Sequence, residues 1–209
     1  MSRKLKRFKH NHCFYKMEVY SFSLIDDAGK HFEKVGDVFY LPHNSDFKIV
    51  FHNRSDKRAN VEFLLDGAVV GDFRSNPHSN IKLERPVDKQ KAFKFVSANS
   101  EEGKQGRLDL APKLGTIEIR VDPEREYSRR SVYNFNNKHG FDETDKSTPV
   151  VDCCSVASAS ASSASLGGTV LGRHSDQRFT SAEHIYTTGQ IVVLSARMMV
   201  KLPVESLHM

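Results

Sequence analysis

The sequence predicts an all-β protein with one principal domain built as a β-sandwich or barrel. Between residues 17 and 121, seven or eight short segments alternate apolar and polar residues at intervals of about 10 residues, with turn-forming residues between them. The 3.6-residue apolar periodicity of amphipathic helices is absent. A chain of 209 residues is within the size of a single large all-β domain.

The first strands are predicted from strict alternation. In "EVYSFSLI", residues 18–25, Tyr20, Phe22 and Leu24 share one face. "DVFYL" follows and ends at Pro42, which lacks the N–H that would continue a ladder. "DFKIVFHN", residues 46–53, forms the next strand.

The strongest local signal is Asp66-Gly67, between "NVEFLL" and "AVVGDF". Asp-Gly is a favoured pair for a two-residue type I′ turn, because both positions require positive φ. We expect a hairpin with strands at residues 60–65 and 68–73. This turn role explains why an aspartate stands at position 66, so we do not interpret Asp66 as a catalytic carboxylate.

Later strands follow the same pattern. They are expected in "NIKLERP", "KAFKFVS" and "GTIEIRVDPE", and a long final strand is expected in "GQIVVLSARMMVKLP". Residues 123–189 read as a long irregular excursion before that last strand, with a Ser/Ala/Gly-rich run over residues 155–172. Because glycine permits close backbone approach and unusual turns, Gly167 and Gly168 are candidate assembly-loop residues.

Residues 1–16 are predicted to be a flexible basic arm. Its cationic residues are Arg3, Lys4, Lys6, Arg7 and Lys9. Subtracting these five from 31 basic residues leaves 26, equal to the 26 acidic residues, so the net charge of +5 belongs to the arm. Such an arm would bind an anionic partner by counterion release; the alternative is a solvated tail that only aids solubility.

Catalytic and metal-binding patterns are not found in the sequence. His10, His12 and Cys13 lie in the basic arm, where positive charge opposes a cation. His174, Ser175 and Asp176 are consecutive, whereas a catalytic triad is assembled from separate elements. No glycine-rich phosphate loop and no run of about 20 apolar residues occurs. We therefore expect no enzyme activity, no cofactor, no metal and no membrane-spanning segment.

The combination of a basic arm, one sandwich, the Asp66-Gly67 hairpin, the pair of segments in "ERPVDKQKAFKFV" and the excursion ending in "GGTVLGRHSDQRF" resembles the single jelly-roll capsid proteins of large icosahedral DNA viruses of algae and amoebae. The length is closer to a penton-type or minor capsid protein than to the double jelly-roll major capsid protein. The Ser/Ala-rich excursion departs from a minimal jelly roll.

This resemblance implies a single jelly-roll domain of about eight antiparallel strands over residues 17–209. It also implies a structural role in the virion, assembled in the host cytoplasm. It implies a fivefold homo-oligomeric ring in contact with major and minor capsid proteins, and no catalytic residues. The alternative is a non-catalytic β-sandwich module that recognises glycan or nucleic acid through its loops. Oligomeric state distinguishes the two, because a capsid subunit must assemble.

Overall fold

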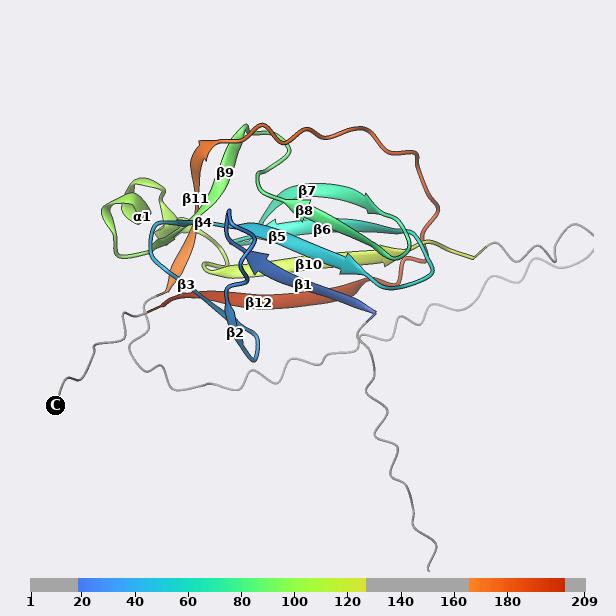
Figure 1. Ribbon diagram of the computed structural model, residues 1–209, viewed down its shortest axis with the longest axis horizontal. Helices are drawn as coiled ribbons and strands as arrows, with labels where there is room; N and C mark the ends of the chain where they lie inside the picture. The colour runs from blue at the N-terminus through green and yellow to red at the C-terminus, as the bar shows by residue number, and fades with distance from the viewer. Residues whose placement is uncertain (1–18, 127–165, 202–209) are drawn as a thin grey trace, which may run out of the picture.

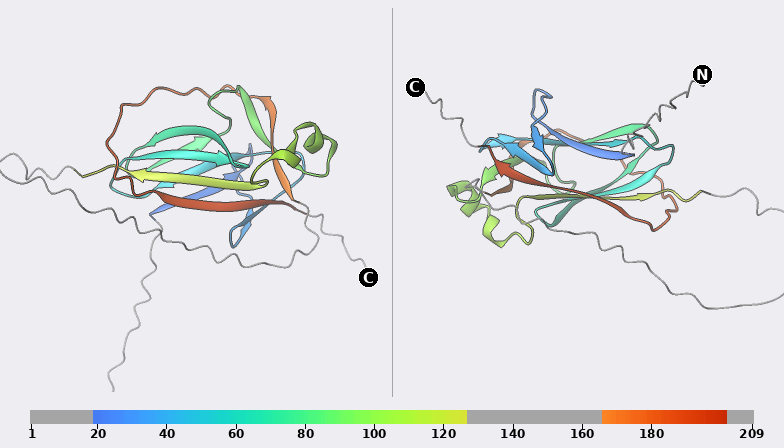
Figure 2. Two further views of the ribbon diagram at one scale, coloured as in Figure 1. Left: turned by 180° about the vertical axis from the view of Figure 1, so that it is seen from behind. Right: turned by 90° about the horizontal axis from the view of Figure 1, so that it is seen from below.

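In a computed structural model, which describes residues 19–126 and 166–201, the chain forms two facing layers of β-strands (Figures 1 and 2). The all-β prediction is confirmed. One layer is a six-stranded sheet in the order β2-β3-β12-β10-β6-β7. Its strands are β2 (Glu33–Val35), β3 (Val38–Leu41), β12 (Val192–Val200), β10 (Thr116–Pro123), β6 (Ala59–Leu65) and β7 (Ala68–Ser75).

The opposite layer contains two three-stranded sheets, ordered β1-β5-β8 and β11-β9-β4. Their strands are β1 (Tyr20–Ile25), β5 (Lys48–Asn53), β8 (Ser79–Leu83), β11 (Gly167–His174), β9 (Lys91–Ser97) and β4 (Ser45–Asp46). Backbone bonds join the two sheets, since Phe47 N–H donates to Phe93 C=O and Phe93 N–H donates to Glu84 C=O. They therefore act as one bent layer, in which β9 and β11 stand across the end of the sandwich (Figure 1).

Part of the strand order is similar to that of immunoglobulin-type sandwiches, although β2, β3 and the sheet β11-β9-β4 lie outside the correspondence. Strands β1-β5-β8 follow the order A-B-E, and β7-β6-β10-β12 follow the order C′-C-F-G. The jelly-roll form of the sandwich is therefore not established by these pairings. The expectation of antiparallel pairing throughout is wrong at one place, because β3 and β12 are parallel, with Phe39 opposite Met198.

Phenylalanine dominates the core between the layers. Six of the largest fully buried side chains are Phe39, Phe47, Phe51, Phe63, Phe93 and Phe95. The Phe51 ring from one layer meets Phe63 from the other edge to face, with 6.2 Å between centroids. Along β5 and β10, buried residues alternate with half-buried ones, as the alternation in the sequence predicts.

The expectation that residues 123–189 form an irregular excursion is wrong for residues 167–174. This segment is β11, which pairs antiparallel with β9, with Gly168 opposite Val96 and Leu171 opposite Phe93. The chain then crosses over the sandwich to the far end before entering β12 (Figure 1). Glycine concealed the strand, because glycine is depleted in strands and residues 167–174 contain three glycines and few apolar residues to alternate.

Gly167 and Gly168 are consequently strand positions rather than loop residues. A Cβ added at Gly167 would lie 2.2 Å from Cζ of Phe95, and one at Gly168 would lie 2.6 Å from Cδ1 of Leu114. Both glycines are buried. Their lack of a side chain lets β11 lie against the core, which corrects their assignment as assembly-loop residues.

The Asp66-Gly67 hairpin is confirmed. Asp66 and Gly67 have φ of 52° and 83°, the positive values that a type I′ turn requires. Leu65 pairs with Ala68 across the turn. The strands are slightly longer than expected, and a bulge interrupts their register between Phe63 and Leu64.

Gly67→Val should destabilise the fold by about 1–3 kcal/mol more than the same change at Gly29. Both glycines have φ of +83°, so a β-branched residue is strained at either. Only at Gly67 would the new Cβ lie 2.8 Å from Cγ of Pro112, because Gly29 has nothing within 4 Å. Thermal and denaturant unfolding measure the difference; equal losses would show that the Pro112 contact does not matter.

Candidate functional site

A hollow of about 300 Å³ opens between strands β7 and β11 at the hairpin end of the sandwich. Its apolar lining includes Val69, Val70, Phe93, Leu108, Pro112, Val170 and Leu171. These residues come from two sheets and from the segment between β9 and β10, which contains the short helix α1 (Glu101–Gln105) and the 3-10 turn η1 (Leu108–Leu110). The hollow therefore lies where the edges of the two layers meet.

Asp66 fixes the inner wall of this hollow. Its side chain is only 7% exposed, and its carboxylate oxygens accept hydrogen bonds from Gly115 N–H at 2.6 Å and Thr169 N–H at 2.7 Å. Its own N–H donates to Thr116 C=O. Burial raises the pKa of Asp66, and the N–H donors oppose this rise. The carboxylate thus joins the hairpin to β10 and β11.

Two further depressions adjoin the hollow, and all three share Lys89 and Leu171. Four basic side chains contribute to their lining: Lys89, Lys91, Lys94 and Arg107. Within the part of the chain that the structure describes, none of the four forms an ion pair. The rim therefore carries four basic groups without ion-pair partners among the described residues, in depressions that the acidic Asp66, Asp88 and Glu102 also line.

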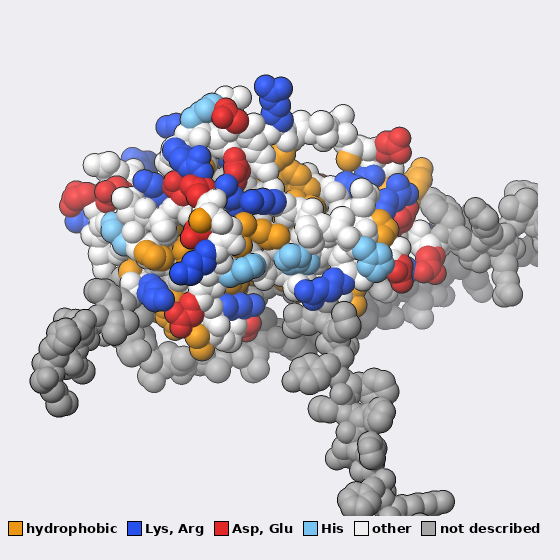
Figure 3. All heavy atoms as spheres, in the orientation of Figure 1, with side chains coloured by type: hydrophobic (Ala, Val, Ile, Leu, Met, Phe, Trp, Pro, Cys, Tyr) orange, Lys and Arg blue, Asp and Glu red, His pale blue; other side chains and the backbone are white. Residues whose placement is uncertain are grey.

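Large apolar side chains are exposed around the same end. Val69 is 59% exposed and Leu110 is 67% exposed, and Val87 and Leu171 are also exposed. We call these four residues the hollow-end surface. In the view of Figure 3, hydrophobic side chains appear between charged ones rather than as a continuous patch. The feature that distinguishes this end is therefore the concave hollow with its basic rim, beside which these apolar side chains are exposed.

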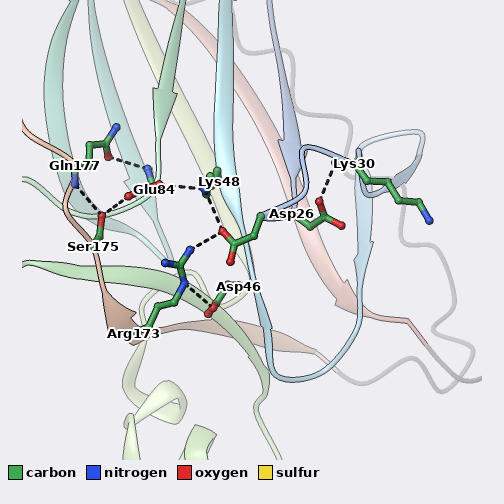
Figure 4. A network of polar contacts seen from close by, with 9 residues as sticks. Asp26, Lys30, Asp46, Lys48, Glu84, Arg173, Ser175 and Gln177 are labelled. Carbon is green, nitrogen blue, oxygen red and sulfur yellow. Dashed lines mark hydrogen bonds and ion pairs between the residues drawn. The ribbon is translucent and has the colours of Figure 1, made fainter.

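A polar network fastens the end of β11 beside this surface (Figure 4). Arg173 donates to Asp27 at 2.6 Å and to Asp46 at 3.2 Å, and Lys48 bridges Asp27 and Glu84. Burial tends to raise the pKa of Asp27, but hydrogen bonds from Lys48 and Arg173 outweigh it and lower the pKa overall. The network ties β11 to the loop after β1 and to β4, β5 and the end of β8.

The consecutive residues His174, Ser175 and Asp176 do not form a catalytic set. Ser175 is buried and its hydroxyl donates to Glu84, which lowers the pKa of that carboxyl, with Lys48 adding to the effect. His174 lies 3.4 Å from Asp176 on the surface. The serine and the histidine therefore have separate partners.

Gln177 and Phe179 continue the attachment. Arg85 is buried, donates to Gln177 C=O through two of its nitrogens, and stacks on the Phe179 ring with Cζ 4.4 Å from the centroid. Gln177 also bonds to Glu84 N–H and Lys82 C=O. The segment after β11 is thus held against β8 by polar and cation–π contacts.

The residues that the sequence analysis singled out lie in different parts of the chain. Asp66 and Gly67 lie at the hollow, and Gly167 and Gly168 lie behind it in β11. The basic arm, with Arg3, Lys4, Lys6, Arg7 and Lys9, lies outside the described residues. The basic residues of the rim were not predicted as a group, because their position around the depressions depends on β11, whose strand the sequence pattern did not reveal.

Metal-binding groups and membrane-spanning helices are two further features to consider in the described residues. Across residues 19–126 and 166–201, no group of three or more His, Cys, Asp or Glu is arranged to hold a metal ion. In the same residues, no helix is long and apolar enough to cross a membrane.

Comparison with models of known protein families, with curated proteins and with solved structures finds no match to this chain.

Asp66→Asn is expected to lower the free energy of unfolding by about 1–3 kcal/mol. Asn tolerates positive φ and suits a type I′ turn, so the turn itself is conserved. The amide has one acceptor oxygen in place of two, which leaves the N–H of Gly115 or Thr169 without an acceptor in a buried position. Denaturant unfolding of the two proteins measures this loss; wild-type stability in the variant would contradict the bridging role.

Arg173→Gln should destabilise the protein only near neutral pH. The pKa values of Asp27 and Glu84 are lowered in the folded protein, so their contribution is complete above the unfolded values, about 4, and is lost as pH falls through the folded values. Because these groups are partly exposed, we expect a loss of about 0.2–1 kcal/mol at neutral pH. Unfolding measured from neutral to acidic pH tests this.

Arg197→Gln is the matched control, because Arg197 is exposed and forms no ion pair with the described residues. Its effect should not vary over the same pH range. A loss in Arg173→Gln that persists at the acidic end would show that the ion pairs are not its cause.

Proposed function

We propose that the protein is a non-catalytic structural protein that acts through protein–protein contacts. In the specific form indicated by the sequence resemblance, it is a capsid subunit, of the penton or minor type. The single observation that supports this role is the presence of exposed apolar residues at both ends of the sandwich. Shell subunits touch more than one neighbour, so they need more than one contact surface.

The second surface lies at the opposite end of β10 from the hollow. Tyr186, Ile191 and Val193 are each more than half exposed there, and we call them the far-end surface. Strand β10 begins at Thr116, which bonds to Asp66, and beyond its other end Glu124 pairs with Thr187. The hollow-end surface lies beside a concave basic rim and the far-end surface does not share those residues, which suits the head-to-tail contacts of a cyclic, pentameric ring in the proposed role.

The capsid form draws its support from the resemblance and from the basic arm, not from strand order. The capsid proposal includes a jelly-roll topology. Contacts made through the two ends of a sandwich do not depend on that topology. The interface of a stable ring should bury at least about 1,000 Å² in total. If the interface between subunits of the ring is smaller than this, contacts with neighbouring capsid proteins would add to its stability.

A second candidate is a binding module for an anionic polymer, such as nucleic acid or an acidic glycan. The basic rim of Lys89, Lys91, Lys94 and Arg107 favours it, because such polymers bind by releasing counterions from basic surfaces. The apolar hollow beside these residues favours a protein partner instead. We therefore rank the structural role first.

The test is the native mass of the full-length protein and of two surface variants. The wild-type chain should form a homo-oligomer, and Leu110→Glu and Ile191→Glu should each reduce its mass by introducing a charge on an exposed apolar contact. Val35→Glu is the matched control, because Val35 is 59% exposed in β2 and belongs to neither surface. A strictly monomeric wild type that elutes from heparin in high salt would instead support the polymer-binding module.

A further inference from the structure

We propose that the hollow-end surface binds an extended acidic and apolar segment of a partner protein, which adds as a strand to the free edge of β11. This inference rests on the proposed function only in treating this surface as a protein contact. It assigns the chemistry of the partner and the mode of binding, which the proposed function leaves open.

The outer edge of β11 is available in the described structure. In its sheet, β11 is hydrogen-bonded to β9 and forms the edge of the order β11-β9-β4. Thr169 N–H points away from β9, since it donates to Asp66. Peptide groups of an antiparallel strand alternate in direction, so the N–H and C=O of Leu171 also point away from β9. These groups can pair with an added strand.

The start of this edge is already closed, which limits where a strand can add. Asp66 occupies Thr169 N–H, and Leu166 bridges to Met199. The later part, around Leu171, borders the hollow and both adjoining depressions. An added strand would therefore pair at Leu171, before the register of β11 shifts between Leu171 and His174, with alternate side chains directed into the hollow and toward the rim.

Charge complementarity identifies the partner. The charged side chains that line the three depressions, apart from Asp66, are four basic groups, Lys89, Lys91, Lys94 and Arg107, and two acidic groups, Asp88 and Glu102. The basic groups have no ion pair among the described residues, whereas Arg173 nearby is neutralised by Asp27 and Asp46. Acidic residues on the added strand would supply the missing partners.

Apolar chemistry excludes a simple polyanion as the preferred occupant. Val69, Val70, Leu108, Val170 and Leu171 line the hollow, and phosphate or sulfate groups would gain nothing from these side chains. A strand that alternates apolar and acidic residues satisfies both the hollow and the rim. The mode is therefore strand addition with side-chain pockets, in which backbone bonds supply affinity and pockets supply specificity.

The probe is a fluorescein-labelled seven-residue peptide of alternating valine and glutamate, titrated into the full-length protein. We expect saturable binding by fluorescence anisotropy. Two peptide controls separate the contributions: alternating valine and lysine should bind at least about tenfold more weakly because of charge. The second control is the Val/Glu peptide with N-methyl groups on alternate backbone nitrogens, made in two versions that methylate either the odd or the even positions. One of the two versions should lose a similar amount of affinity, because its methylated nitrogens cannot donate the hydrogen bonds of the ladder.

Protein variants locate the binding. The double variant Lys89→Gln, Lys91→Gln should weaken binding about tenfold and reduce its dependence on salt. The double variant Lys30→Gln, Lys82→Gln is the matched control, because it removes two exposed lysines away from the depressions and should bind like wild type. In hydrogen–deuterium exchange, the Leu171 amide should become protected when the peptide binds.

Each outcome has a distinct meaning. Equal binding by the N-methylated peptides, or an unprotected Leu171 amide, overturns strand addition. Binding of heparin or a single-stranded oligonucleotide through the same lysines, without binding of the Val/Glu peptide, replaces the proposed partner with a polyanion. Peptide binding to a protein that never self-assembles supports this inference and refutes the capsid role. Assembly without peptide binding overturns this inference alone.

Discussion

The buried carboxylate of Asp66 is the interaction on which the hollow end depends. It lies at the tip of one hairpin, yet it accepts hydrogen bonds from Gly115 before β10 and from Thr169 in β11. These elements come from distant parts of the sequence and from both layers. Because burial raises the free energy of the charged form, the carboxylate is tolerated only where N–H donors compensate it. A turn residue therefore sets the distance between the two sheet edges that enclose the hollow.

A second fastening operates at the other end of β11. Arg173 bonds to Asp27 and Asp46, and Ser175 bonds to Glu84, so Asp66 holds the strand near its start and three carboxylates hold it at and just beyond its end. At the start of the strand, Gly167 lies against Phe95 of β9 and Gly168 lies against Leu114, where a side chain would hold β11 away. The lysines of β9 and of the preceding loop become a rim because β11 is held in this position.

The sequence predicted the sheets better than the site, and the reason is physical. Alternation specifies which residues share a face, so Tyr20, Phe22 and Leu24 were placed correctly on one buried face. Asp66-Gly67 specified its turn because few residue pairs tolerate positive φ. Strand β11 has no such alternating pattern. It begins with two glycines, which let its backbone approach the core closely but give no apolar side chains to alternate. The parallel pairing of β3 and β12, and the burial of the Asp66 carboxylate, are tertiary contacts without a local pattern.

The position of β12 has a consequence for synthesis of the chain. This last strand lies in the interior of the six-stranded sheet, between β3 from the beginning of the chain and β10. Until residues 192–200 leave the ribosome, β3 and β10 have no neighbour on their facing sides, and the sheet exists as two separate parts. Unpaired strand edges attract other chains, and pairing between such distant segments is slow. The nascent protein therefore passes through a stage at which the edges of β3 and β10 are unpaired and open to association with other chains.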